Sequence, residues 1–300
     1  MNGLPPLVRR VFVGTSGLRA GWRLLIFVAM VVVLYTGGNR GVGLLFPRGD
    51  PGIMFLVREA LHLGEFLFAA WVMGRIERRR IADYGLPWRR MFRRDFWLGA
   101  LVGFAGLSAL IFALAVGGFA SFGGVALSGP DIAIWAVGWG LVFVLVALFE
   151  EFATRGYGLF VLTQGVGFWP AALITSAFFA YRHTGNSGED WIGVANVGGF
   201  GLLLCLILRR TGDLWAPIGL HAGWDWGESF FYGVGNSGHV EPHHLLAATP
   251  AGPGWLSGGS VGPEGSVLCS ALLAAMIALV AVGLRGVRYP PASAALAQAA

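Results

Sequence analysis

The chain has 300 residues, of which 56% are hydrophobic and only 12% charged, and its mean hydropathy is +0.68. A soluble globular domain carries roughly 25% charged residues, so this composition excludes an ordinary soluble protein and predicts a polytopic membrane protein. The net charge of +5 depends on arginine, because the chain contains no lysine. The arginines lie at the ends of apolar segments, which indicates membrane topology rather than nucleic-acid binding.

Eight apolar segments approach the roughly 20 residues that a helix needs to cross a bilayer. We therefore expect an all-α fold, a polytopic transmembrane helix bundle with about eight spans, seven being the alternative. Glycines spaced like Gly99 and Gly103 suit close helix packing in lipid. The segments lie at about 22–37, 53–74, 96–117, 132–154, 170–183, 191–208, 214–233 and 266–285.

Arginine-rich connections alternate with arginine-poor ones along the chain. If both termini are cytoplasmic, every arginine-rich connection faces the cytoplasm, as the positive-inside rule requires, and the protein is a multi-pass protein of the cell (inner) membrane. The Gly-, Ser- and Pro-rich loops around 118–131 and 234–265 then face outwards. The alternate loops hold only Arg40 and Arg48, whereas the cytoplasmic side holds Arg9, Arg10, Arg19, Arg23, Arg75, Arg78, Arg79, Arg80, Arg89, Arg90, Arg93, Arg94, Arg209, Arg210, Arg285 and Arg288.

The fourth apolar segment ends in a charged cluster, although each ionisable group costs ~2.5–3.5 kcal/mol to insert. Glu151 and Arg155 are four residues apart, share a helix face and can form an ion pair. Glu150 lies about 100° around the helix and keeps a free carboxylate. A free carboxylate in a poorly solvated site suits a general base for water. The alternative is a salt-bridged helix end among lipid headgroups.

Two further segments carry histidines. Phe179 precedes His183 by one turn at the end of the fifth segment, where interfacial packing is the alternative interpretation. His221 and Asp225 share a helix face inside the seventh segment. Such a pair can hold a metal ion, orient a histidine or donate to an oxyanion, or it can join two helices.

In this order, on three separate segments, the patterns EExxxR, FxxxH and HxxxD resemble the motifs of the CPBP family of CAAX-processing and bacteriocin-processing intramembrane proteases. The segment 214–221, LWAPIGLH, resembles the third conserved block of that family. The resemblance covers roughly residues 137–232. It implies a CPBP-like catalytic helical core at 131–235, between N-terminal transmembrane helices at 1–130 (about three spans) and an outer loop with a C-terminal transmembrane helix at 236–300.

The resemblance also implies the activity and the roles of the residues. The expected protein is an intramembrane endopeptidase that acts on a membrane-associated peptide or protein, with the lipid bilayer and no nucleic acid as further partner. We expect its cavity to open toward the cytoplasm. Glu150 and His183 would activate water, His221 and Asp225 would stabilise the oxyanion, and Glu151, Arg155 and Phe179 would provide structural support.

One position departs from the family pattern. The third motif often ends in Asn, whereas an ionised Asp225 can only accept hydrogen bonds. The sequence requires no cofactor, because it has no HExxH motif. The family was long described as metalloproteases, however, and a divalent metal such as zinc stays an alternative, with Glu150, His183 and His221 as ligands.

Other functions use similar residues or motifs. A rhomboid-like serine protease needs GxSG, which Ser16 matches in 14–17, but this match precedes the first span. An intramembrane aspartyl protease needs a GxGD motif, which is absent. A proton-coupled transporter uses membrane carboxylates and histidines too, and a bacteriocin immunity protein or scaffold could keep the fold without the chemistry.

Overall fold

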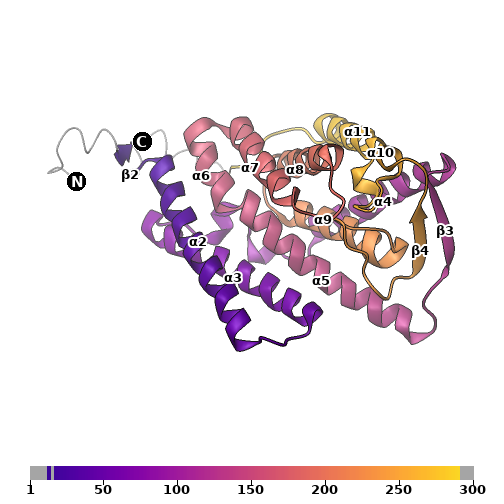
Figure 1. Ribbon diagram of the computed structural model, residues 1–300. Coiled ribbons are helices and arrows are strands. Elements are labelled where there is room, and N and C mark those ends of the chain that lie inside the picture. Colours follow the sequence, from indigo (N-terminus) through magenta and orange to yellow (C-terminus); the bar gives the residue numbers. More distant parts are fainter. Residues whose placement is uncertain (1–11, 15–16, 291–300) are drawn as a thin grey trace.

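The computed structural model describes residues 12–14 and 17–290 and confirms the all-α class (Figure 1). Arg9, Arg10 and Ser16, which entered the topology and motif arguments, lie outside the described residues. The α-helices are α2 Ala20–Leu45, α3 Pro51–Glu77, α4 Arg94–Val116, α5 Pro130–Arg155, α6 Tyr157–Val166, α7 Phe168–His183, α8 Trp191–Thr211, α9 Trp215–Trp226, α10 Gly254–Ser257 and α11 Val267–Gly283. The short elements are the 3-10 helices η1 Ile81–Tyr84, η2 Trp88–Arg90 and η4 Pro263–Gly265, the π-helix η3 Gly227–Tyr232, and the strands β1 Val13–Gly14, β2 Gly17–Leu18, β3 Ala120–Val125 and β4 Leu246–Pro250.

Every apolar segment expected from the sequence lies in a helix, but the count of eight spans is not confirmed. Among the described residues, four helical segments are long and apolar enough to cross a membrane: Ala20–Leu45, Arg94–Val116, Pro130–Val166 and Trp191–Thr211. The helix α11 is apolar but shorter. The helix α3 carries several charges within its length, and α7 and α9 have only 16 and 12 residues.

The long segment Pro130–Val166 is two helices, because the chain breaks at Gly156 between α5 and α6. A Cβ at this position would collide with the carbonyl oxygen of Phe152. Residues 157–166, which hydropathy left as a connection, thus form the helix α6. Its side chains Tyr157 and Phe160 are fully buried.

The backbones of the helices α4 and α9 approach each other closely. A Cβ on Gly99 or Gly103 would overlap the backbone of α9, and one on Gly219 or Gly223 would overlap the backbone of α4. Small residues let two backbones approach in this way. The predicted role of Gly99 and Gly103 is therefore confirmed, and this contact holds α9 in place.

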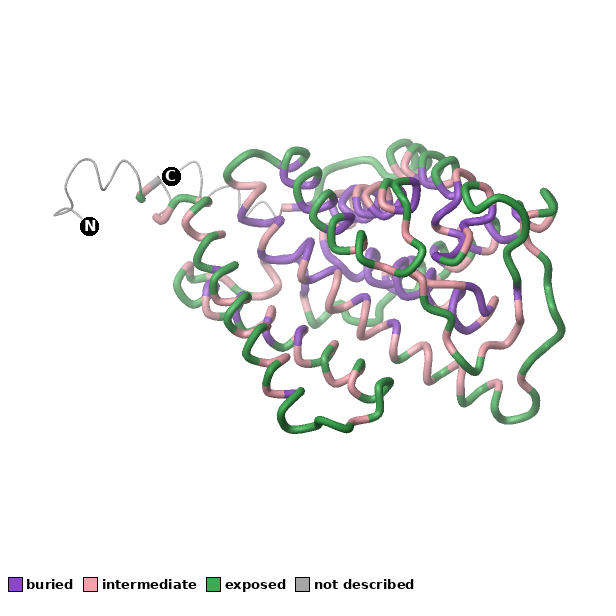
Figure 2. The backbone as a smooth tube through the Cα atoms, in the orientation of Figure 1, coloured by how far each residue is buried: buried purple, intermediate pink, exposed green. Residues whose placement is uncertain are grey.

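Buried residues gather where α7, α8 and α9 meet α4 and α5, while the outer surface of α2 is exposed (Figure 2). That surface is apolar, with Val32, Val33 and Leu44 between 56% and 82% exposed. Apolar side chains exposed along a long helix fit contact with lipid tails. The inner helices α8 and α9 thus form the core, and α2 covers one side of the bundle.

The connections between helices lie at two ends of the bundle. We call the segments 75–94, 209–214 and 285–290 the arginine face. Within it, the amide of Leu214 donates to Gly85 at 2.8 Å, that of Arg288 donates to Arg209 at 2.9 Å, and Arg90 pairs with the carboxylate of Asp213 at 2.7 Å.

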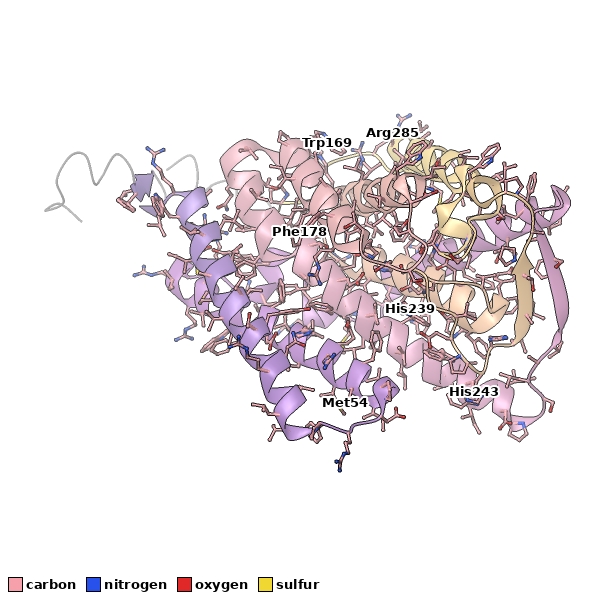
Figure 3. All side chains as sticks on the ribbon, in the orientation of Figure 1. Met54, Trp169, Phe178, His239, His243 and Arg285 are labelled. Carbon is pink, nitrogen blue, oxygen red and sulfur yellow. The ribbon has the colours of Figure 1, made fainter. Side chains whose placement is uncertain are left out.

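We call the segments 46–50, 117–129, 184–190 and 233–266 the loop face. There β3 pairs antiparallel with β4, so the two expected outer loops contain a short sheet. The indole of Trp139 on α5 donates to the carbonyl of Pro242 at 3.2 Å. Figure 3 shows Arg285 at the upper edge of the molecule and Met54 and His243 at its lower edge.

Candidate active site

The two adjacent glutamates at the end of α5 have different surroundings. The Glu151 side chain is fully buried, and its Oε1 accepts from Arg155 Nη1 at 2.7 Å. Glu150 keeps 28% of its side chain exposed and lines a cavity. The helical spacing predicted both the ion pair and the separate position of Glu150, because one residue corresponds to about 100° of helix rotation.

His221 lies between three carboxylates. Its Nδ1 contacts Glu151 Oε1 at 2.9 Å, and since a carboxylate oxygen accepts, this nitrogen donates. Its Nε2 is 3.5 Å from Asp225 Oδ2 and 3.7 Å from Glu150 Oε2. The contact with Glu151 was not predicted, since the two residues are 70 positions apart and no local pattern connects them.

The Arg155–Glu151–His221 chain is buried from end to end. Arg155 is 0% exposed and His221 is 6% exposed. A ligating or catalytic histidine is oriented by the partner of its other ring nitrogen. Glu151, itself held by Arg155, therefore fixes the ring of His221 so that Nε2 faces Glu150 and Asp225.

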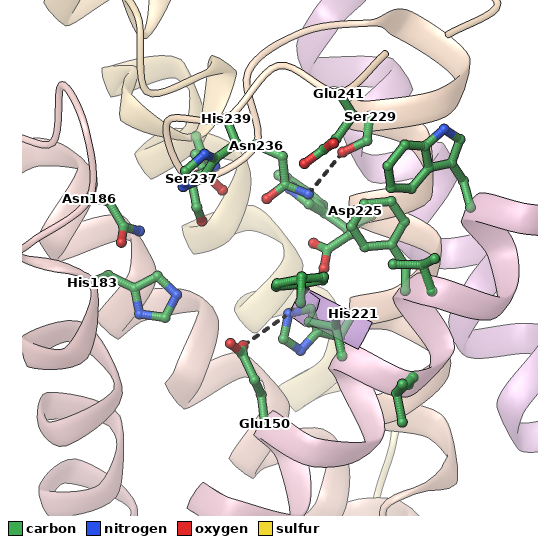
Figure 4. A pocket seen from close by; sticks show the side chains of 18 of the residues that line it. Glu150, His183, Asn186, His221, Asp225, Ser229, Asn236, Ser237, His239 and Glu241 are labelled. Carbon is green, nitrogen blue, oxygen red and sulfur yellow. Dashed lines mark hydrogen bonds and ion pairs between the residues drawn. The ribbon is translucent and has the colours of Figure 1, made fainter. Parts of the chain in front are cut away.

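His183 lies across the cavity from Glu150 and His221 (Figure 4). Its Nδ1 is 2.8 Å from the carbonyl oxygen of Phe179, so Nδ1 must donate and Nε2 is left for the cavity. Among the described residues, His183 makes no hydrogen bond or ion pair with Glu150. The two side chains would be joined only through a molecule that lies between them.

Phe179 connects the three motifs. Its ring centroid lies 4.8 Å from Arg155 Cζ, in cation–π geometry, and edge-to-face with His183 and His221 at 4.6 and 6.2 Å. The ring fills the space between the buried ion pair and the two histidines. It can therefore set the spacing of the histidines by packing.

The candidate residues face a cavity of about 1250 Å³. Its walls are mainly apolar and come from the first half of α3, from α5 and from α8. Its polar lining, besides Glu150, His183, His221 and Asp225, consists of Arg182, Asn186, Asn196, Ser229, Asn236, Ser237, His239, Glu241 and Glu264.

Asn236 is a cavity residue that the sequence analysis missed. It comes from the outer loop, where its amide Nδ2 donates to Ser229 Oγ at 3.3 Å, and its side chain lies near Asp225 in the cavity wall (Figure 4). No motif marks it, because its position depends on how the loop folds back over α9. An amide thus lies beside the carboxylate that departs from the family pattern.

The alternative metal site does not fit this arrangement. In the part of the chain that the structure describes, no three His, Cys, Asp or Glu side chains are arranged to hold a metal ion. Glu150 and His221 are neighbours, but His183 lies on the opposite wall. No step through a metal is therefore derived.

The remaining histidines have packing partners. His62 Nδ1 contacts Glu65 Oε2 at 2.9 Å and its ring stacks on Tyr35 at 4.0 Å, so His62 belongs to a buried polar patch in α3. In the outer loop, His243 stacks on Trp135 at 3.9 Å. His239 lines the cavity.

Comparison with known proteins shows that the segment with these residues is similar to a protein family. Residues 132–227, about a third of the chain, match the family model described as type II CAAX prenyl endopeptidase Rce1-like. The matched segment contains all three motifs and lies within the predicted core 131–235. Neither the curated proteins nor the solved structures gave a match. Over the segment that carries its candidate active site, the chain is therefore similar to the Rce1-like family of CAAX endopeptidases, as its motifs predicted.

Proposed function

We propose that the protein is an intramembrane endopeptidase that cleaves a membrane-associated peptide or protein. The family match supports a membrane protease in general. The observation that carries the proposal is the position of Glu150, a partly exposed carboxylate in the wall of a large cavity, 3.7 Å from His221 and opposite His183. The arginine distribution supports a cell-membrane location with both termini cytoplasmic.

In the proposed reaction a water molecule lies between Glu150 and His183. Glu150 takes a proton from the water while Nε2 of His183 orients it, since Nδ1 is committed to the carbonyl of Phe179. The resulting hydroxide attacks the carbonyl carbon of the scissile peptide bond. Glu150 then gives the proton to the peptide nitrogen as the C–N bond of the tetrahedral intermediate breaks, which releases a carboxylic acid and an amine and regenerates the Glu150 carboxylate.

The negative oxygen that forms in this step needs a donor. Two carboxylates face Nε2 of His221, while Nδ1 already donates to Glu151, and this surplus of negative charge favours a proton on Nε2. The Nε2–H group can donate a hydrogen bond to the oxyanion as it develops. Asp225, 3.5 Å from Nε2, holds this N–H group of His221 in place. In other enzymes, the loss of one hydrogen-bond donor to the oxyanion lowers the rate by a factor of ~10²–10³.

The test compares two isosteric substitutions. Glu150→Gln should abolish cleavage, because an amide cannot accept the proton of water, while the protein remains folded since the side chain is partly exposed. Glu65→Gln is the matched control, a buried membrane carboxylate that pairs with His62 and does not line the cavity. The substrate is found by comparing membrane-associated peptides of cells with either variant.

Three results are informative. Peptides that accumulate uncleaved with Glu150→Gln but not with Glu65→Gln support the proposal and identify the substrate. Accumulation with both variants indicates a general loss of fold. Unchanged cleavage with a folded Glu150→Gln protein refutes the mechanism and favours a transporter or scaffold.

A further inference from the structure

The cavity lies between the catalytic candidates and the loop face. Its polar rim is formed by Asn186 in the segment 184–190 and by Ser237, His239 and Glu241 in the segment 233–266. Among the described residues that line it, none belongs to the arginine face. This differs from the expectation that the cavity opens toward the arginine-rich side.

The route from Glu150 to the arginine face is filled by side chains. Phe152, Arg155, Tyr157 and Trp215 are each at most 1% exposed. Tyr157 packs against Tyr84, and the indole of Trp215 donates to the carbonyl of Pro87 at 3.0 Å. Glu150 therefore lies at the bottom of a cavity that is closed on the arginine side.

The charges of the two faces are opposite. Most of the 21 basic residues of the chain belong to the arginine face or to helix ends beside it. The segments 117–129 and 233–266 contain no arginine, and Arg40, Arg48 and Arg182 are the exceptions near the loop face. Carboxylates on this face are Asp50, Glu189, Asp190, Glu241 and Glu264, and Asp131 lies beside it in the first turn of α5. Short loops rich in arginine stay in the cytoplasm during insertion, so the loop face lies outside.

From the closed arginine side and the open loop side, we infer that the substrate enters the cavity from the extracytoplasmic face of the membrane. This inference rests on the proposed function. The substrate is then a peptide or protein anchored in the membrane with its scissile segment exposed outside the cytoplasm. Its apolar part fits the wall formed by Phe55 and Leu56 of α3 and Leu141 and Val142 of α5, and its polar part fits the rim.

The orientation is tested without any substrate. Val240→Cys places a thiol on the loop face, where Val240 is 64% exposed, and Met91→Cys places one on the arginine face without removing an arginine. The native Cys205 and Cys269 are buried, so the wild type is the unlabelled control. A membrane-impermeant maleimide should label Val240→Cys in intact cells and Met91→Cys only after permeabilisation. The reverse pattern overturns the inference and leaves the proposed chemistry untouched.

The entry route is tested with two neighbouring positions in one loop. His239 lines the cavity and is exposed, whereas Val240 is exposed but does not line it. A bulky maleimide attached from outside should stop cleavage in His239→Cys and leave it intact in Val240→Cys. If labelled His239→Cys cleaves as fast as the unlabelled variant, entry from the loop face is refuted. The proposed function is tested separately by the unlabelled Glu150→Gln protein, because its loss of cleavage does not depend on the side from which the substrate enters.

Discussion

The buried ion pair at the centre of the site allows a quantitative prediction for Arg155→Leu. Arg155 is 0% exposed, donates to Glu151 at 2.7 Å and lies 4.8 Å from the ring of Phe179. Its removal leaves the carboxylate of Glu151 buried with His221 as its remaining partner. Breaking a buried pair in this way costs ~3–5 kcal/mol. Substitution of the exposed Arg89 by Leu, the control, should change stability by less than about 0.5 kcal/mol.

A double-mutant cycle separates the stranded charge from lost packing. Glu151→Gln alone strands the guanidinium and should cost about as much as Arg155→Leu alone, ~3–5 kcal/mol. The double variant strands no charge, so its cost should be well below the sum, with a coupling of ~1–3 kcal/mol. The measurement is reversible unfolding of the purified protein in detergent, followed by helix content. A cost below about 1 kcal/mol for Arg155→Leu, or additive single effects, would refute this account of the pair.

Three further predictions follow from the same site. Asp225→Asn should keep most of the cleavage rate, because its amide can position Nε2 of His221, whereas Asp225→Ala should lose ~10²–10³ in rate; equal loss in both contradicts the assigned role. Desolvation, then the neighbouring carboxylate of Asp225, raises the pKa of Glu264 in the outer loop from 4.5 to about 8. Between pH 4.5 and about 8 the folded protein therefore holds a proton on Glu264 that the unfolded chain releases, so the stability of the loop should fall as pH rises through this window. Proteolysis of the loop measures this stability, and Glu264→Gln should remove its pH dependence. Strong chelators should leave cleavage by the purified protein unchanged, because Glu150, His183 and His221 do not meet at one point. Loss of cleavage after chelation, followed by its recovery on addition of zinc, would contradict this prediction.

Local sequence patterns determined much of the architecture. Composition predicted a membrane protein, and the apolar segments marked the helices, because the cost of burying polar groups in lipid acts on each segment separately. Helical periodicity also predicted the Glu151–Arg155 pair and the shared face of His221 and Asp225, since residues four apart are neighbours on any helix. Gly99 and Gly103 marked the close contact of α4 with α9.

Tertiary packing decided what these residues do together. The contact of Glu151 with His221, the position of His183 across the cavity and the approach of Asn236 to Asp225 join elements far apart in the chain. The side on which the cavity opens likewise depends on which buried side chains fill the space below Glu150. Helix periodicity fixes the face on which a residue lies, but only the packing of several helices fixes what that face meets.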